Sequence, residues 1–296
     1  MDQQIKIAYI LGDGRSGSTL LDGILANVEG AVSVGESYRF WERFYKRDTL
    51  CSCGERIERC PMWSAVAQAL EERHGPYDVE QIKAAIKHYF KFANTRKFLR
   101  GETDPEIVLL LDMVGNFYRE IATVSKCKVI VDSSKSPAWA ILLSRVPGFD
   151  VRFIHLERDL ASVASSWKKT MVLPEYYGEE AYMPVKSNAT VIRTWLRVKY
   201  LARVVAKQQY LFLTYERLCD DYLAVKQQLE SFLGVDIPET MHWQGSHAIA
   251  GNPTRAVSQK EIVVRPYSPS TSNISELEVA MFNMIDKASI VLRQQL

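Results

Sequence analysis

The sequence predicts an α/β fold in three layers, with a central parallel sheet covered by helices on both faces. Short apolar runs rich in β-branched residues recur along the 296-residue chain, and helical patterns follow most of them. The first run leads through a glycine-rich turn directly into a helical pattern. Because strands and helices alternate in this way, a parallel sheet with helical crossovers is favoured over a sandwich or a bundle.

Five runs are the expected strands: Ile5 to Leu11, Val32 to Val34, Lys128 to Val131, Val151 to Leu156 and Tyr210 to Thr214. Each strand is followed by polar residues, which read in chain order GDGRSGST, GES, DSSKSP, ERD and YER. In an open parallel sheet, ligands bind in a crevice at the carboxyl ends of the strands. We therefore expect these five segments to line one site.

Between Phe40 and Ser125 the pattern changes to one helix after another. Apolar residues at spacings of three and four predict helices in 61–75, 78–99 and 104–124. Asp78 and Asp104 are suitable N-caps for two of them, and Gly75 and Gly101 are suitable ends. Residues from about 40 to 126 are therefore interpreted as a helical insertion that covers the active edge of the sheet. A further helical stretch, Ser187 to Gln208, precedes the last strand.

Composition restricts the classes of function. Lys and Arg exceed Asp and Glu by 37 − 35 = 2, so the chain lacks the global positive charge of a nucleic-acid-binding protein. Any anion site must be local. A hydrophobic content of 47% is typical of a folded protein, and we expect one domain over residues 1–296. The first apolar run is too short for a signal peptide or membrane anchor, which predicts a cytoplasmic protein without an integral membrane segment. The oligomeric state is left open.

The segment GDGRSGST, residues 12–19, has the character of an anion-binding loop. A strand, a glycine-rich turn and a helix start together present backbone N–H groups to an anion. The loop nearly matches G-x-x-x-x-G-K-[ST], but Ser18 stands in place of the lysine that reaches the β- and γ-phosphates. Arg15 offers instead a fork suited to two anionic oxygens. The alternative is a tight turn that needs Gly14 and Gly17 only for its backbone.

A second anion-binding candidate is HLERDLASVASSW, where Arg158 ends a strand and Ser166 follows eight residues later in a helix. Asp159 or Ser162 can begin that helix. This pattern is weak by itself, because the arginine could pair with a neighbouring carboxylate while the serine faces solvent.

In this order the two segments resemble the sulfotransferases that use 3′-phosphoadenosine 5′-phosphosulfate (PAPS), and in motif style the bacterial and tyrosylprotein types. In that family a basic residue and a Ser-Gly-Thr/Ser-Thr run bind the 5′-phosphosulfate. The matching residues, with the glycine before them, are Gly14, Arg15, Ser16, Gly17, Ser18 and Thr19. Arg158 and Ser166 match the signature that binds the 3′-phosphate. The resemblance implies a P-loop-NTPase-like fold, PAPS as cosubstrate, 3′-phosphoadenosine 5′-phosphate (PAP) as product and a hydroxyl-bearing acceptor, without a metal.

The resemblance also suggests catalytic residues. Glu36, in VGES, resembles the base of the tyrosylprotein branch, which accepts the proton of the acceptor hydroxyl as it attacks sulfur. Lys135, in VDSSKSP, could stabilise the charge on the leaving phosphate, as could Arg15. The alternatives are a surface glutamate paired with Arg39 and a solvated loop lysine. His247 is the reserve base, since cytosolic members commonly use a histidine.

Two later segments match the family more loosely. HAIAGNPTRAVSQ, residues 247–259, resembles a loop that closes over the nucleotide phosphates, which would place Arg255 on the 3′-phosphate side. Tyr215, in LTYERL, resembles part of a Tyr-Glu element for which we expect a supporting role at the nucleotide site.

Three of the five cysteines lie close together in CSCGERIERCPMW, as Cys51, Cys53 and Cys60. The C-x-C-x6-C spacing offers three thiols, lacks the paired C-x2-C of ordinary zinc sites, and has no obvious fourth ligand. We therefore expect no metal, and a structural role for these cysteines in reduced or disulfide form.

Two other classes of function remain open. A small-molecule kinase would use the same loop with ATP and magnesium, although the missing lysine argues against it. A noncatalytic nucleotide-binding module would bind the same ligand without turning it over. The acceptor cannot be identified from the sequence.

Overall fold

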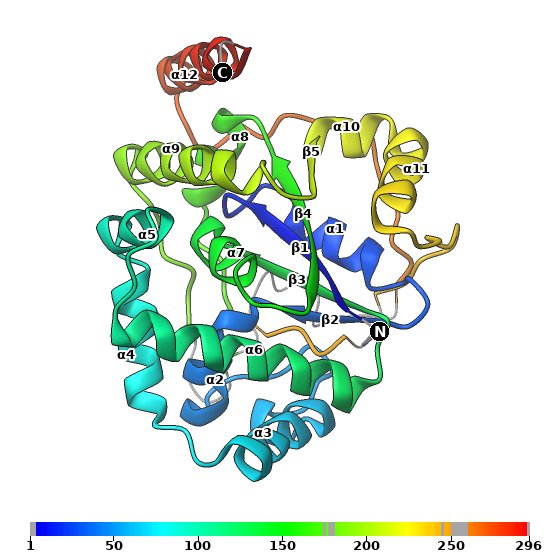
Figure 1. The fold of residues 1–296 in the computed structure, drawn as a ribbon. Coiled ribbons are helices and arrows are strands. Elements are labelled where there is room, and N and C mark those ends of the chain that lie inside the picture. The colour runs from blue at the N-terminus through cyan, green and yellow to red at the C-terminus, as the bar shows by residue number, and fades with distance from the viewer. Residues whose placement is uncertain (1–3, 174–175, 177–180, 244–245, 250–259, 295–296) are drawn as a thin grey trace.

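The computed structural model describes residues 4–173, 176, 181–243, 246–249 and 260–294. Within these residues one parallel sheet has the strand order β2-β3-β1-β4-β5 (Figure 1). The strands are β1 (Ile5–Gly12), β2 (Ala31–Gly35), β3 (Val129–Lys135), β4 (Phe149–Glu157) and β5 (Tyr210–Thr214). The predicted α/β class and the five predicted strands are confirmed. The strand β3 continues through Lys135, whereas the sequence suggested that it ends at Val131.

The two faces of the sheet are covered by different helices. Along β1, Ile7, Tyr9 and Leu11 belong to one hydrophobic core, while Ala8 and Ile10 belong to another, because successive strand residues point to opposite faces. The first face is packed by α6 (Pro105–Ser125), α7 (Pro137–Leu143) and α9 (Asn188–Val205). The second is packed by α1 (Ser18–Leu25), α10 (Tyr215–Asp220) and α11 (Tyr222–Leu233). The protein therefore has the predicted three layers (Figure 1).

A third, smaller core joins α8 (Leu160–Trp167) to α9 and to α12 (Glu276–Gln294). Phe282 of α12 is fully buried in it. Through this packing the last helix supports the helix that carries Ser166. In the described part of the chain, none of the helices is both long and apolar enough to span a bilayer.

The helical insertion lies between β2 and β3. Its α-helices are α2 (Phe40–Lys46), α3 (Pro61–His74), α4 (Val79–Tyr89), α5 (Phe92–Leu99) and α6, with 3-10 turns at Ser37–Arg39 and Ile57–Arg59. The predicted caps are present. Asp78 accepts a hydrogen bond from the backbone of Gln81, Asp104 accepts one from Ile107, and Gly75 ends α3 with φ 81°.

The single helix predicted over 78–99 is wrong, because the chain breaks between α4 and α5 at Phe90 and Lys91. Two polar side chains of α5 turn back to the end of α4. Asn94 Nδ2 donates to the carbonyl of His88 (2.9 Å), and Thr95 Oγ1 donates to that of Tyr89 (2.8 Å). Because these side chains satisfy carbonyls that a continuous helix would bond internally, they stabilise the break.

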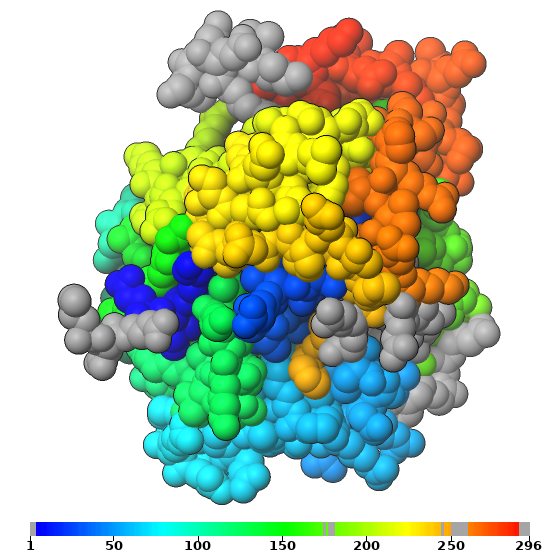
Figure 2. Space-filling view, turned by 90° about the vertical axis from the view of Figure 1, so that its right-hand side faces the viewer, coloured from blue at the N-terminus to red at the C-terminus, as the bar shows by residue number. Residues whose placement is uncertain are grey.

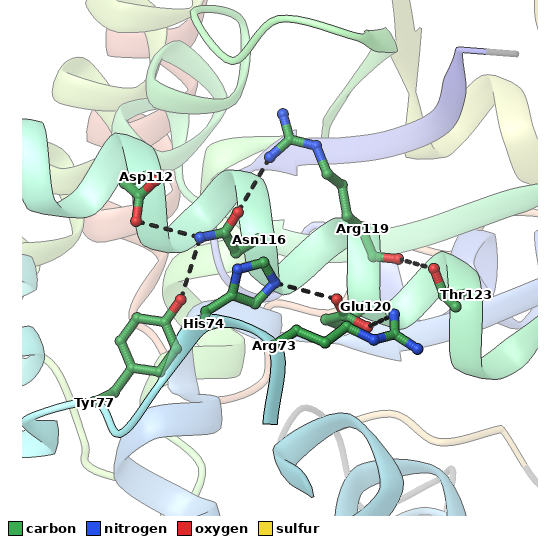
Figure 3. A network of polar contacts seen from close by, with 8 residues as sticks. All are labelled: Arg73, His74, Tyr77, Asp112, Asn116, Arg119, Glu120 and Thr123. Carbon is green, nitrogen blue, oxygen red and sulfur yellow. Dashed lines mark hydrogen bonds and ion pairs between the residues drawn. The ribbon is translucent and has the colours of Figure 1, made fainter. Parts of the chain in front are cut away.

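A buried carboxylate fixes α3 against α6 (Figure 3). Glu120, only 3% exposed, accepts hydrogen bonds from Arg73 Nη1 (2.7 Å) and His74 Nε2 (3.2 Å) at the end of α3. One turn earlier on α6, Asn116 Nδ2 donates to the hydroxyl of Tyr77 (3.3 Å). These contacts hold the C-terminal end of α3, whose N-terminal end begins directly after Cys60.

Candidate active site

A pocket of about 260 Å³ lies at the carboxyl edge of the sheet. Lys135, the last residue of β3, and residues that follow the other four strands contribute to it, so the structure brings together the five polar segments that the sequence placed there. Its lining residues are Gly14, Arg15, Gly17, Ser18, Thr19, Leu20, Glu36, Lys135, Arg158, Ser166, Trp167, Met183, Tyr215 and Trp243.

The glycine-rich loop is shaped by two aromatic rings. Gly17 has φ 90°, and a Cβ there would lie 2.1 Å from the ring of Tyr215. A Cβ on Gly14 would lie 2.5 Å from the ring of Trp167. Only glycine fits at these two close approaches. The loop thereby brings Ser18 and Thr19, the first residues of α1, to the pocket, where the positive end of the helix dipole favours an anion.

The Arg15 side chain contacts two methionine sulfurs and an aromatic ring. Its Nη2 lies 2.6 Å from the sulfur of Met183 and 3.2 Å from that of Met171, and its guanidinium is 5.3 Å from the ring of Trp167. No carboxylate of the described residues forms an ion pair with it. Burial lowers the pKa of Arg15, because the charged form leaves water. Thioethers are weak acceptors, so a phosphate or sulfate oxygen would be a stronger partner for this group.

Arg158 occupies the other side of the loop. Its guanidinium is 4.9 Å from the ring of Tyr215, and its Nη1 lies 3.5 Å from the carbonyl oxygen of Arg15. Ser166 lines the same pocket from α8. The start of α8 is fixed from both sides: the Asp159 side chain accepts from the Ser162 N–H (2.7 Å), and the Asp159 N–H donates to the side chain of Glu216 (2.9 Å). Asp159, rather than Ser162, is thus the N-cap.

Glu36 lies between two cations. Its Oε1 is 2.7 Å from Lys135 Nζ, and its Oε2 is 2.7 Å from Arg39 Nε. Burial by itself raises the pKa of this carboxyl, but Lys135 and Arg39 outweigh burial and lower the pKa to about 2. The glutamate therefore does pair with Arg39, as the simpler interpretation suggested, and it also lines the pocket.

The backbone around Glu36 is fixed from both directions. The Glu36 N–H donates to the carbonyl of Ile249 (2.8 Å), and Gly35 has φ 68°. On the other side, buried Asp132 accepts from the hydroxyl of Ser37 and, at 2.5 Å, from that of Tyr118. A carboxylate anchored in the sheet thus positions the residue that follows Glu36.

Three predicted residues are placed elsewhere or lie outside the structure. Ser16 is fully buried and does not line the pocket. Arg255 lies outside the described residues. His247 lies beside the cysteines, with its Nδ1 3.1 Å from Cys60 Sγ, and no histidine is among the described residues that line the pocket. The expectation that the cysteines lack a fourth donor is therefore wrong, because the fold brings His247 to them from 187 positions away.

Several pocket residues were missed in the sequence. Trp167, Met183 and Trp243 line the pocket, and Lys186 Nζ lies 3.3 Å from the ring centroid of Trp167. Burial lowers the pKa of Lys186, which also interacts electrostatically with Asp13, Arg15 and Glu36. Apart from Trp167, which follows Ser166 directly, these residues lie in irregular segments where no spacing rule marks them.

Residues 8–239 match the model of the sulfotransferase family. Solved structures similar to the chain include the sulfotransferase domain of the olefin synthase from Synechococcus PCC 7002, which is 23% identical with a TM-score of 0.43 and covers 81% of this chain and 77% of that one. The sulfotransferase domain from the curacin biosynthetic pathway is 20% identical, with a TM-score of 0.46 and coverages of 87% and 84%. A sulfotransferase from Mycobacterium tuberculosis H37Rv is 14% identical, with a TM-score of 0.43 and coverages of 80% and 70%. These likenesses are distant, and no curated protein matches the chain.

Proposed function

Because the chain belongs to the sulfotransferase family, we propose that it transfers a sulfuryl group from PAPS to an acceptor hydroxyl by in-line displacement. The observation that carries this proposal is the pocket itself. It combines two arginines that pair with no carboxylate of the described residues with an adjacent glutamate–lysine pair. The two arginines suit a donor with two separate anionic groups, and the glutamate suits an acceptor that must lose a proton.

The proposed donor would be held at two positions. Arg15, with Gly14, Gly17 and the start of α1, binds the 5′-phosphosulfate through charge and backbone N–H groups. Arg158 and Ser166 bind the 3′-phosphate, and the ring of Tyr215 supports the Arg158 guanidinium. For Ser16 we retain only a backbone contribution, because its side chain does not face the pocket. Arg255 stays a prediction.

The Glu36–Lys135 pair would supply the chemistry. In the free protein, a carboxyl with a pKa of about 2 is a weak base. When Lys135 moves its ammonium group from Glu36 to the departing phosphate oxygen, it offsets the negative charge that develops there. The same movement removes one of the two cations from Glu36 and raises its proton affinity. The acceptor oxygen bonds to sulfur as the sulfur–phosphate oxygen bond breaks, the proton goes to Glu36, and PAP leaves.

The family match does not favour the kinase alternative, and turnover separates an enzyme from a noncatalytic nucleotide-binding module. Thermal shift tests the nucleotide, since a ligand that binds the native state raises its stability. We expect PAP to raise the melting temperature more than ADP, which lacks the 3′-phosphate. Stabilisation by ATP with magnesium but not by PAP would contradict the proposal. Labelled PAPS with a panel of hydroxyl acceptors then tests transfer and identifies the acceptor class.

A further inference from the structure

Four potential metal ligands converge where the insertion meets segment 246–249, and none of them lines the pocket. They are the thiols of Cys51, Cys53 and Cys60 and the imidazole of His247, and their donor atoms all lie within 4.8 Å of one another. Cys60 Sγ is 3.1 Å from His247 Nδ1, Cys53 Sγ is 3.7 Å from Cys60 Sγ, and Cys51 Sγ is 4.0 Å from His247 Nδ1.

These separations suit one tetrahedral ion. With zinc–sulfur bonds of about 2.3 Å and zinc–nitrogen bonds of about 2.0 Å, neighbouring donors in a tetrahedron lie about 3.5–3.8 Å apart. The three observed distances, 3.1, 3.7 and 4.0 Å, extend slightly below and above that range. The distance between Cys53 and Cys60 is also far from the roughly 2.05 Å of a disulfide bond. The cysteines are free thiols in the structure.

The two parts of the cluster are held by independent backbone contacts. On the cysteine side, the Gly54 N–H donates to the carbonyl of Cys51 (2.9 Å), and Gly54 has φ 92°. This tight turn places Cys53 beside Cys51. On the other side, the His247 N–H donates to the carbonyl of Ser33 in β2 (3.1 Å), so the histidine is aligned by the sheet.

The cluster also connects these two parts of the chain. The indole of Trp63, in α3, donates to the carbonyl of His247 (2.7 Å). In the space-filling view, the short segment 246–249 (amber) emerges between α1 (blue) and α3 (light blue) (Figure 2). Two residues after the histidine, the carbonyl of Ile249 accepts from the Glu36 N–H.

We propose that Cys51, Cys53, Cys60 and His247 form a structural zinc site. Three thiolates and one imidazole form a ligand set that zinc prefers, and four protein ligands leave no open position for catalysis. Binding displaces the thiol protons. Cys51 and Cys60 are buried, while Cys53 and His247 are partly exposed and give the ion a path of entry. The ion clamps segment 246–249 between the insertion and β2, next to the backbone of Glu36.

Metal content tests the site directly. The full chain, expressed with added zinc and purified without chelators, should contain about one zinc per chain by plasma mass spectrometry. Cys53→Ser and His247→Ala should each weaken zinc retention against a competing chelator by more than about tenfold, since even outer-shell changes cost 10–100-fold. His247→Cys should retain zinc, because it replaces one good ligand with another. Cys127→Ser, a partly exposed cysteine outside the cluster, is the matched control and should change nothing.

A cobalt(II) test on the wild-type chain does not depend on how the variants fold. Cobalt in place of zinc should give thiolate charge-transfer bands and the visible spectrum of a tetrahedral site. Chelation should lower the melting temperature of the wild-type protein. The proposal is overturned if the folded chain takes up neither ion, or if mass spectrometry finds a disulfide between Cys53 and Cys60 in protein purified under reducing conditions.

Discussion

The pocket and the cysteine cluster differ in whether their buried polar atoms have partners within the protein. Around the pocket, buried polar atoms have no hydrogen-bond partner among the described residues: Asp13 Oδ2, Arg15 Nε, Ser16 Oγ, Arg158 Nε and Trp167 Nε1. In the cluster, all four donor atoms face one another. Unpaired buried polar groups cost stability, and the unpaired N–H groups of Arg15, Arg158 and Trp167 could donate to the oxygens of the proposed donor. The cluster is arranged for a single ion.

The backbone shows the same contrast. Arg15 (φ 73°) and Lys135 (φ 64°) have left-handed conformations at the pocket, whereas in the cluster loop such a φ falls on Gly54. A side chain in this conformation costs about 1–2 kcal/mol, and such strain collects at functional sites. Substitutions in the pocket should therefore mainly lower ligand affinity and turnover. Substitutions in the cluster should mainly lower the stability of the fold.

The largest effect is expected for Glu36→Gln. Loss of a general base lowers kcat by about 10²–10⁴-fold. PAP affinity, measured by calorimetry, should stay within a few fold, because glutamine keeps the shape of the side chain. Glu42→Gln is the control: Glu42 also pairs with Arg39, at 3.8 Å, but is exposed, so turnover should be unchanged. Normal turnover in Glu36→Gln would remove Glu36 as the base.

Gly17→Ala should disrupt the loop. The new Cβ would meet the Tyr215 ring at 2.1 Å, and left-handed strain adds about 1–2 kcal/mol to an overpacking cost of about 1–3 kcal/mol. Gly101→Ala provides the control, because Gly101 has φ 86° but nothing within 4 Å of its Cβ. In urea unfolding, Gly17→Ala should lower the free energy of unfolding more than Gly101→Ala does, and it should also abolish PAP binding. Equal losses would mean that the ring does not shape the loop.

Arg158→Ala should weaken PAP binding selectively. A charge-assisted hydrogen bond contributes about 1.5–3 kcal/mol, which corresponds to roughly 10–100-fold in Kd. ADP has no 3′-phosphate, so its Kd should change little in the same variant. Calorimetry with both nucleotides measures the difference. If PAP and ADP lose affinity equally, Arg158 does not bind the 3′-phosphate.

Asp13→Asn should make the protein more stable at neutral pH. Burial raises the pKa of Asp13 to about 6, above its usual value near 4, so the native state favours the protonated form. The charged carboxylate is therefore destabilising above pH 6, and this penalty disappears as the pH falls from about 6 to 4. We expect a gain of about 1–2 kcal/mol at pH 7.5 and none at pH 4, measured by urea unfolding. A gain that is the same at both pH values would show that charge is not its cause.

The sequence predicted those parts of the site that depend on local pattern. Arg15, Glu36 and Arg158 each follow a strand, Lys135 ends one, and parallel strands bring their carboxyl ends to one edge. Lys186 could not be found in this way, because it reaches Trp167 from an irregular segment.

The remaining errors came from side chains whose partners lie far away or break a local pattern. His247 is 187 residues from Cys60, and its alignment along β2 has no sequence signature. The break between α4 and α5 depends on the side chains of Asn94 and Thr95 bonding back to α4, although the apolar spacing continues through it. Periodicity reports which face is buried and does not report such contacts.

The fluorescence of Trp167 should report on ligand binding at the pocket. Lys186 Nζ lies 3.3 Å from its ring centroid and the Arg15 guanidinium 5.3 Å, so two positive charges act on its excited state. Trp41, Trp63, Trp139 and Trp195 are buried and should give a constant background, whereas Trp243 also lines the pocket and adds to the signal. When an anion draws Arg15 away from the ring, the emission should change in wavelength and intensity. Binding at the pocket can then be followed in real time by intrinsic fluorescence, without a label.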